Sequence, residues 1–210
     1  MKRRLFLALP LIACATVPAH AASSDTAARI FQIIDAMDVE HLWPAGQHVN
    51  WRTGIPDGKP VGTEGKHTHC SAFVAAAAEK LGIYILRPPE HSAKLLANAQ
   101  VEWLNADGQQ QGWVSVPDMA EAQDKANAGF LVVAAYHNYH DDKPGHIAII
   151  RPGSKPSGLF AQEGPDVTQA GENNYVSNSL KQGFKAHPAA WRDHEIQYFA
   201  HAVDPGAISN

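Results

Sequence analysis

The chain has 210 residues and a formal net charge of −4 at pH 7, from 17 basic and 21 acidic residues. Affinity for nucleic acid comes largely from Lys and Arg that neutralise phosphates, so this balance argues against a nucleic-acid partner. The length suits one domain with a well-buried core.

The first residues are typical of an export signal. Three basic residues at positions 2–4 precede an apolar run over 5–13, and residues 19–21 form a small-x-small cleavage site. We therefore expect residues 1–21 to be removed, which takes the charge from −4 to −7 because three basic and no acidic residues are lost. The apolar run is too short to span a bilayer, so we predict a periplasmic or secreted protein with no membrane contact beyond export.

A lipid anchor is the alternative at this end of the chain. The segment Leu-Ile-Ala-Cys ending at Cys14 resembles the lipobox of bacterial lipoproteins, whose cysteine is lipidated. In both cases the mature fold keeps a single unmodified cysteine, Cys70, and therefore no internal disulfide.

We expect residues 22–210 to form a single domain that begins with a helix. Ser24 or Asp25 is suited to cap it, and apolar residues recur at helical spacing as far as Met37. The next segment, His41–His69, is interrupted repeatedly by Pro and Gly, which predicts a long loop of the kind that often carries function.

Four tryptophans are either core or groove residues. Trp43 and Trp51, in the Gly/Pro-rich loop, fit a ligand groove as well as they fit the core. For Trp103 and Trp113 we favour the core.

An alanine-rich run that begins at Cys70 predicts a helix that ends at Gly82. Its small side chains predict close packing against a sheet. Further helices are expected over His91–Asn105 and from Asp118 to Asn127.

The second half of the chain is rich in strand patterns. Phe130–Tyr136 and His146–Ile150 are short, apolar, β-branched runs on either side of a polar loop, which predicts a hairpin. Val167–Ala170 and Glu195–His201 are expected strands as well. Helices early and strands late predict an α+β fold, with N-terminal helices packed on an antiparallel sheet.

Cys70 is the first candidate for chemistry. It stands at the predicted start of a helix, where unpaired N–H groups and the helix dipole favour a thiolate. The alternative is an inert, buried cysteine, but an unpaired thiol in an exported chain is exposed to oxidants, so its retention favours a catalytic role.

His146 is the second candidate, because the first residue of a strand can direct its side chain over the sheet edge toward a helix start. A nucleophilic cysteine on a helix and a distant histidine are what acyl transfer by thiolate attack requires.

A zinc site is the alternative use of these residues. His67, His69 and Cys70 form one cluster of ligand types, and His137 and His140 form a second. The chain lacks the C-x-x-C or H-E-x-x-H spacing that identifies such sites, so we predict no metal and no cofactor.

Two segments resemble a known family. His69–Val74 resembles the D-C-S-G-F-V signature of NlpC/P60 cell-wall peptidases, and Pro144–Ile150 resembles their G-H-V-A-I-Y strand; amidases of the CHAP class are similar in the same parts. Residues 65–175 carry the resemblance, and 22–64 have no counterpart. His69 stands where the family has an acid and Ala72 where it has glycine.

The resemblance implies a papain-like core in which Cys70 attacks a peptide carbonyl and His146 acts as base. It also implies a polar residue on the strand after the histidine strand, to fix the imidazole tautomer. Gln169 is our choice for this orienting residue. The alternatives are Gln162, Glu163 and Asn173.

Contacts to the substrate are predicted around the nucleophile. The backbone N–H of Cys70 is a natural oxyanion donor, and His67, His48 or Trp51 is a candidate for a second one. The residues expected to contact the substrate are Trp51, His67, His69 and Ser71.

The sequence thus predicts an exported cysteine peptidase or amidase that cuts amide bonds in peptidoglycan stem peptides. Two other classes stay open: a zinc-dependent hydrolase or metal-binding protein, and an inactive wall-binding module that kept the fold.

Overall fold

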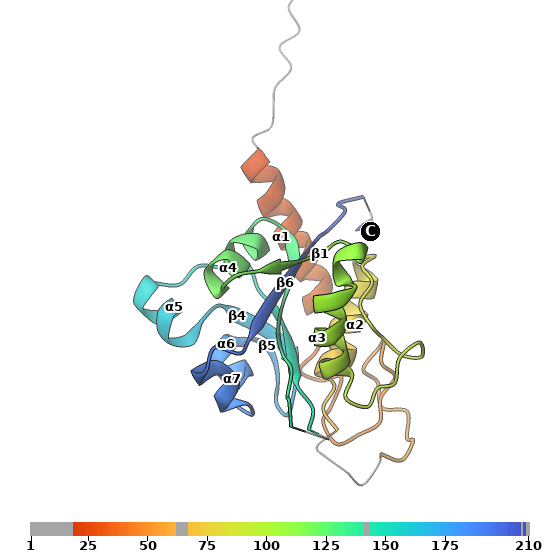
Figure 1. The fold of residues 1–210 in the computed structure, drawn as a ribbon. Coiled ribbons are helices and arrows are strands. Elements are labelled where there is room, and N and C mark those ends of the chain that lie inside the picture. The colour runs from red at the N-terminus through yellow and green to blue at the C-terminus, as the bar shows by residue number, and fades with distance from the viewer. Residues whose placement is uncertain (1–18, 62–66, 141–142, 207, 209–210) are drawn as a thin grey trace, which may run out of the picture.

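A six-stranded sheet forms the centre of the molecule in the computed structural model, which describes residues 19–61, 67–140, 143–206 and 208 (Figure 1). Every strand pairs antiparallel with its neighbours, in the order β1-β6-β2-β3-β4-β5. The strands are β1 Trp113–Val116, β2 Phe130–Tyr136, β3 His146–Ile150, β4 Asp166–Ala170, β5 Asn174–Ser179 and β6 Gln197–Ala202. Cys14, the residue of the alternative lipid anchor, and all but the end of the predicted export signal lie outside the described residues.

Helices cover both faces of the sheet (Figure 1). One apolar cluster joins α1, α2 and α3 to one face, and a second joins α4, α6 and α7 to the other. The prediction of an α+β fold with helices on an antiparallel sheet is confirmed, and the arrangement is consistent with a papain-like core. The helices are α1 Ala19–Asp35, α2 Cys70–Lys80, α3 Leu96–Ala106, the 3₁₀ helix η1 Gly108–Gln111, α4 Met119–Asn127, α5 Ser157–Glu163, α6 Leu180–Gly183 and α7 Pro188–Arg192.

The predicted hairpin of β2 and β3 is confirmed at both strands' bounds, with Tyr136 paired to His146. Side chains alternate between the faces along a strand. In β3, Ile147 and Ile149 therefore belong to the α1–α3 cluster, whereas Ala148 belongs to the other. Because both faces are covered, β3 is buried along its whole length, which explains why it contains no exposed polar position.

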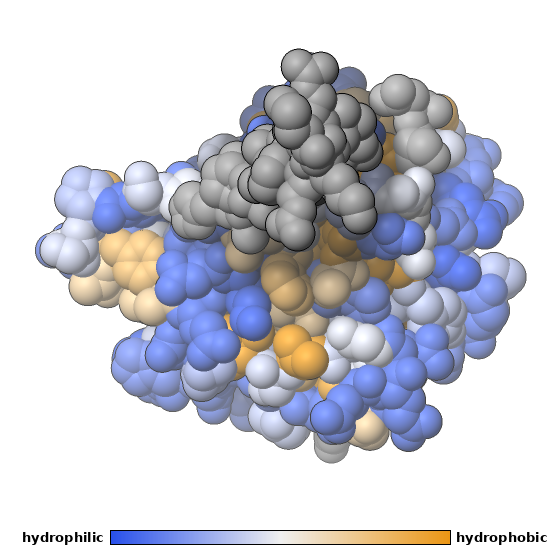
Figure 2. All heavy atoms as spheres, turned by 90° about the horizontal axis from the view of Figure 1, so that it is seen from above, coloured by the Kyte–Doolittle hydropathy of each residue, from blue (hydrophilic) through white to orange (hydrophobic). Residues whose placement is uncertain are grey.

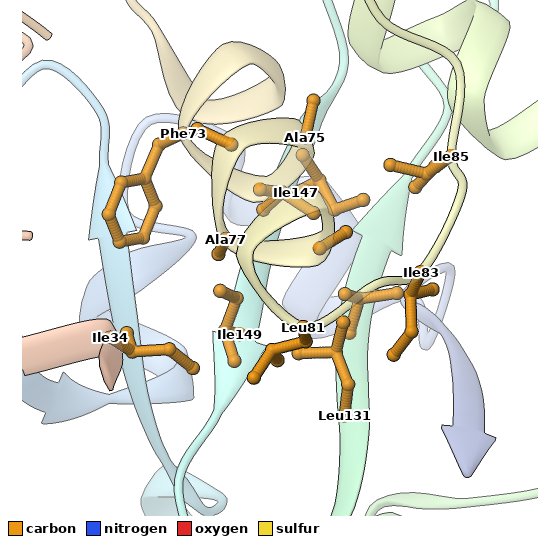
Figure 3. Packing of buried hydrophobic residues seen from close by; sticks show 14 of the residues in the cluster. Ile34, Phe73, Ala75, Ala77, Leu81, Ile83, Ile85, Leu131, Ile147 and Ile149 are labelled. Atoms are coloured by element: carbon orange, nitrogen blue, oxygen red, sulfur yellow. The ribbon is translucent and has the colours of Figure 1, made fainter. Parts of the chain in front are cut away.

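Helix α2 lies against this hairpin (Figure 3). It begins at Cys70 as predicted, and Gly82, with a φ of +71°, follows its end. Every residue from Cys70 to Ala78 is buried. Figure 3 shows Ala77 and Leu81 facing Ile149 and Leu131, so the small alanine side chains allow the helix to lie close to the strands.

Helix α1 begins earlier than predicted. Ser24 and Asp25 lie inside the helix, which starts at Ala19, so neither residue caps it. The alanines that precede them are strong helix formers and continue the helix toward the N-terminus.

Helix α3 begins later than predicted, at Leu96 rather than His91. Leu95 has a φ of +54°, in the left-handed region that no α-helix continues through. Just before it, the Ser92 hydroxyl accepts a hydrogen bond from the backbone N–H of Lys94, a local turn that competes with helix. In contrast, α4 starts as predicted, because the Asp118 carboxylate caps it.

The Gly/Pro-rich segment before α2 is a loop, as predicted, with one isolated bridge between Val49 and Pro56 in its described part. Trp43 belongs to the core, not to a groove: it is 1% exposed and meets the Phe73 ring edge-on at 5.2 Å. Trp51 lines a cavity described below. Trp113 is buried, as predicted.

Most of the surface visible in Figure 2 is hydrophilic, with hydrophobic residues in small groups. Within the described ranges, no helix has the length and apolar character needed to span a bilayer.

Candidate active site

A cavity of about 930 Å³ opens at the end of the sheet where α2 and β3 both begin. Thr68, His69 and Ala72 line it beside the start of α2, and Gly145 and His146 line it at the start of β3. A cavity of this size is within the range of small-molecule and peptide sites.

Cys70 is the first residue of α2 and is 4% exposed. Burial raises the pKa of its thiol, although the backbone of Ile147 and of Ser71 favours the ionised form. The helix start that the sequence analysis expects to favour a thiolate is present, but burial of the side chain opposes its ionisation. Cys70 itself is not among the residues that line the cavity, whereas His69, directly before it, and Ala72, two residues after it, do line it.

His146 and Gln169 form a hydrogen-bonded pair in the wall of the same cavity, with 2.8 Å between the imidazole Nε2 and the amide Oε1. Gln169 lies on β4, the strand after the histidine strand, where the sequence predicted the orienting residue. Both side chains are buried, at 5% and 3% exposure. Burial lowers the pKa of His146 to about 4, although Gln169 opposes the shift.

The hydrogen bonds of Gln169 fix the tautomer of His146. Its amide nitrogen donates to the carbonyl of Asn173 at 3.0 Å, which can only accept, so the amide oxygen must face the imidazole. The neutral ring therefore carries its proton on Nε2 and leaves Nδ1 as an acceptor. This is the form that a general base requires.

Two glycines leave room for the Gln169 amide. A Cβ on Gly183 would lie 3.0 Å from its Oε1, and a Cβ on Gly171 would lie 3.0 Å from its Nε2. Both distances are tighter than ordinary contacts, so the position of the amide depends on the absence of these side chains.

The hairpin loop before His146 is held by Asn98 of α3. The Asn98 amide nitrogen donates to the carbonyls of Asn138 and Lys143, and its oxygen accepts from the N–H of Asn138. At Gly145 a Cβ would overlap the carbonyl of Tyr136. These contacts fix where β3 begins, and therefore where His146 stands.

Two residues that the sequence did not identify touch the His146 ring. Phe184 meets it edge-on, with ring centres 4.8 Å apart, and His187 stacks on it at 5.8 Å. Pro188 follows His187 and occupies the first turn of α7, where proline is favoured. That proline is a sequence signal for a helix start, but it does not indicate a contact with His146.

Three of the four predicted substrate contacts, Trp51, His67 and His69, line the cavity. Ser71 does not: it is buried in α2, and its carbonyl accepts a hydrogen bond from Gln100. Successive helix residues are rotated by about 100°, so Ser71 faces away from the side that Ala72 presents to the cavity.

The residues of the zinc alternative do not converge. Among the described residues, no three His, Cys, Asp or Glu side chains are grouped as metal ligands. His69 bonds instead to the carbonyl of Gln47 at 2.9 Å, and His137 bonds to Glu102 at 2.9 Å.

The alternatives to Gln169 lie elsewhere. Gln162 and Glu163 are on α5, away from the cavity wall, and Asn173 contributes its backbone carbonyl to Gln169.

The sequence matches no known protein-family profile. It is 32% identical over 147 residues to the peptidoglycan amidase Tse1 of Pseudomonas aeruginosa, a stretch that covers 68% of this chain and 80% of Tse1. The chain belongs to the Tse1 family. This relationship supports a peptidoglycan hydrolase, but it does not assign the chain to the NlpC/P60 peptidases or to the CHAP amidases.

Proposed function

We propose that this protein hydrolyses amide bonds in the stem peptides of peptidoglycan, with Cys70 as nucleophile and His146 as general base. The observation that carries the proposal is the buried His146–Gln169 pair in the wall of a cavity that begins beside the start of α2. The relative Tse1 is a peptidoglycan amidase, which supports peptidoglycan as the substrate class.

Two faces of the sheet contribute to the site. Cys70 belongs to the apolar cluster on the α1–α3 face, whereas His146 contacts Phe184 of the opposite cluster. A backbone hydrogen bond from Ile147, the residue after His146, favours the ionised form of the Cys70 thiol and so lowers its pKa. This backbone contact supports the proposal that the two groups meet at the start of β3.

The first half-reaction begins from a neutral thiol and a neutral imidazole, since burial raises the pKa of Cys70 and lowers that of His146. When substrate is bound, Nδ1 of His146 takes the thiol proton as the sulfur bonds to the amide carbon. The C–N bond then breaks, and the leaving amine receives that proton from His146. The product is an acyl-thioester on Cys70.

The second half-reaction uses water. His146 removes a proton from water as the oxygen attacks the thioester carbon, and the sulfur leaves and is reprotonated. The backbone N–H of Cys70, at the start of α2, is the proposed oxyanion donor. Gln169 keeps the proton of the neutral imidazole on Nε2 throughout.

The finer features of the proposal rest on the resemblance of the Cys70 and His146 segments to NlpC/P60 and CHAP enzymes. They include a cysteine mechanism without a metal. The proposed periplasmic or secreted location rests instead on the predicted export signal in residues 1–21 and on where peptidoglycan lies.

Digestion of purified muropeptides, followed by mass spectrometry, tests the function. We expect wild type to release a product that Cys70→Ala and His146→Ala fail to release, while His41→Ala, an exposed remote histidine, behaves as wild type. Iodoacetamide should abolish the activity and a chelator should not. Product from Cys70→Ala would overturn the mechanism; intact wall binding without any product would favour the binding module.

A further inference from the structure

His187 stands between α6 and α7, in a segment far from Cys70 in sequence, yet it lines the same cavity as His146. Its ring is half-buried. The proposed reaction gives it no role, although its ring centre lies 5.8 Å from that of the base.

The α6–α7 segment touches the His146 ring in two ways. Phe184 presents its ring edge at an interplanar angle of 80°, and His187 lies nearly parallel at 25°. His187 is itself held against Tyr136 of β2, with ring centres 5.3 Å apart. The plane of the His146 ring is therefore constrained by aromatic contacts as well as by the hydrogen bond to Gln169.

The ring nitrogens of His187 remain available. No residue that the structure describes forms a hydrogen bond with them, and the side chain faces the cavity. Burial, followed by the nearby His146, lowers the pKa of His187 to about 4. At neutral pH it therefore offers one N–H donor and one acceptor, as a peptide group requires.

We propose that His187 is a further active-site residue whose ring face positions His146 and whose ring nitrogens bind the peptide in the cavity. The inference rests on the proposed function for its substrate and on the geometry of the two rings for its positioning role.

Two substitutions separate the two roles. His187→Phe keeps an aromatic ring beside His146 but removes the nitrogens, so we expect KM to rise about fivefold to tenfold while kcat stays within about twofold. His187→Ala removes both the ring and the nitrogens. Its kcat should be about tenfold below that of His187→Phe, because the base is no longer held in place. His41→Phe and His41→Ala are the matched controls, since that side chain is 78% exposed.

A different result would contradict each of the two proposed roles of His187. An unchanged KM in His187→Phe would overturn peptide binding by the nitrogens, and equal kcat values in His187→Phe and His187→Ala would overturn positioning by the ring. Thermal unfolding of each variant shows whether it is folded.

A measurement without substrate keeps this inference separate from the proposed function. In ¹⁵N-histidine NMR at pH 7, wild type and His187→Phe should show sharp signals for the His146 ring, and in His187→Ala these signals should broaden because the ring orientation is no longer held. Equally sharp His146 signals in His187→Ala would overturn the positioning role even if the wild type released no muropeptide product.

Discussion

The two faces of the central sheet present their candidate catalytic residues in different ways. On one face, Cys70 is carried by α2, a long helix of small residues buried along most of its length. On the other, His146 is held by Gln169 and by the short segment that contains Phe184 and His187.

The two candidate catalytic residues are therefore held in position by different kinds of contact. The nucleophile is placed by bulk packing, which depends on many apolar contacts, whereas the base is placed by a few specific contacts to one ring. Damage to the nucleophile side should therefore reduce stability, and damage to the base side should reduce activity.

Phe73→Ala should give the largest effect. Phe73 lies on α2 (Figure 3), one turn after Cys70. It is fully buried and packs against Trp43. Truncation leaves a cavity, so we expect a loss of about 3–5 kcal/mol in the free energy of unfolding, measured with urea. Leu159→Ala, at a residue 41% exposed on α5, should change stability by less than about 0.5 kcal/mol. An equal loss of unfolding free energy in the two variants would contradict the inference that apolar packing holds α2 in place.

Acid should act mainly on the base side. The pKa of His146 is lowered to about 4 by burial, so between pH 6.5 and 4 the unfolded chain binds a proton that the folded chain does not. Stability is complete above pH 6.5 and falls toward pH 4, by roughly 3 kcal/mol for this residue. His187, whose pKa is also about 4, acts in the same direction.

Urea unfolding at pH 7 and pH 4.5 measures this loss. His146→Phe should reduce the pH dependence, and His41→Ala should not. The activity of the wild type should likewise lose its base only as the pH falls toward 4. An acid limb near 6.5 would contradict a buried, neutral His146.

Gln169→Ala should reduce activity rather than stability. Without the amide oxygen, neither tautomer of His146 is favoured, so we expect kcat/KM to fall about tenfold to hundredfold, comparable to the loss of other groups that orient a histidine. Gln169→Glu keeps an acceptor toward Nε2 and should retain more activity. If both variants matched wild type on muropeptides, the orienting role would be lost.

The same contrast explains what the sequence could predict. The bounds of β2 and β3 and the start of α2 follow from strong, regular patterns of apolar residues, so they were found correctly. Cys70, His146 and Gln169 were found because each stands at a predicted strand or at a helix start. Their placement was predicted; their catalytic roles stay predictions.

The unpredicted elements are short or irregular. β1, β5 and α5–α7 contain four to seven residues each and lack the continuous apolar runs that identify β2 and β3. The stacking of His187 depends on how α6 and α7 return to the sheet, a tertiary contact that no local pattern encodes. The burial of Cys70 was only the alternative in the sequence analysis for the same reason, because desolvation depends on the whole fold.

Gly183→Ala should give the smallest effect and is the sharpest probe of the base side. The new methyl carbon would lie 3.0 Å from Oε1 of Gln169, the atom that accepts from His146, so the amide must shift by a few tenths of an ångström. We expect kcat/KM to fall about threefold, since small misplacements of a catalytic group are costly. Gly158→Ala, where a Cβ meets nothing within 4 Å, is the matched control. A muropeptide assay in which both variants equal wild type would contradict the inference that a small shift of the Gln169 amide reduces catalysis.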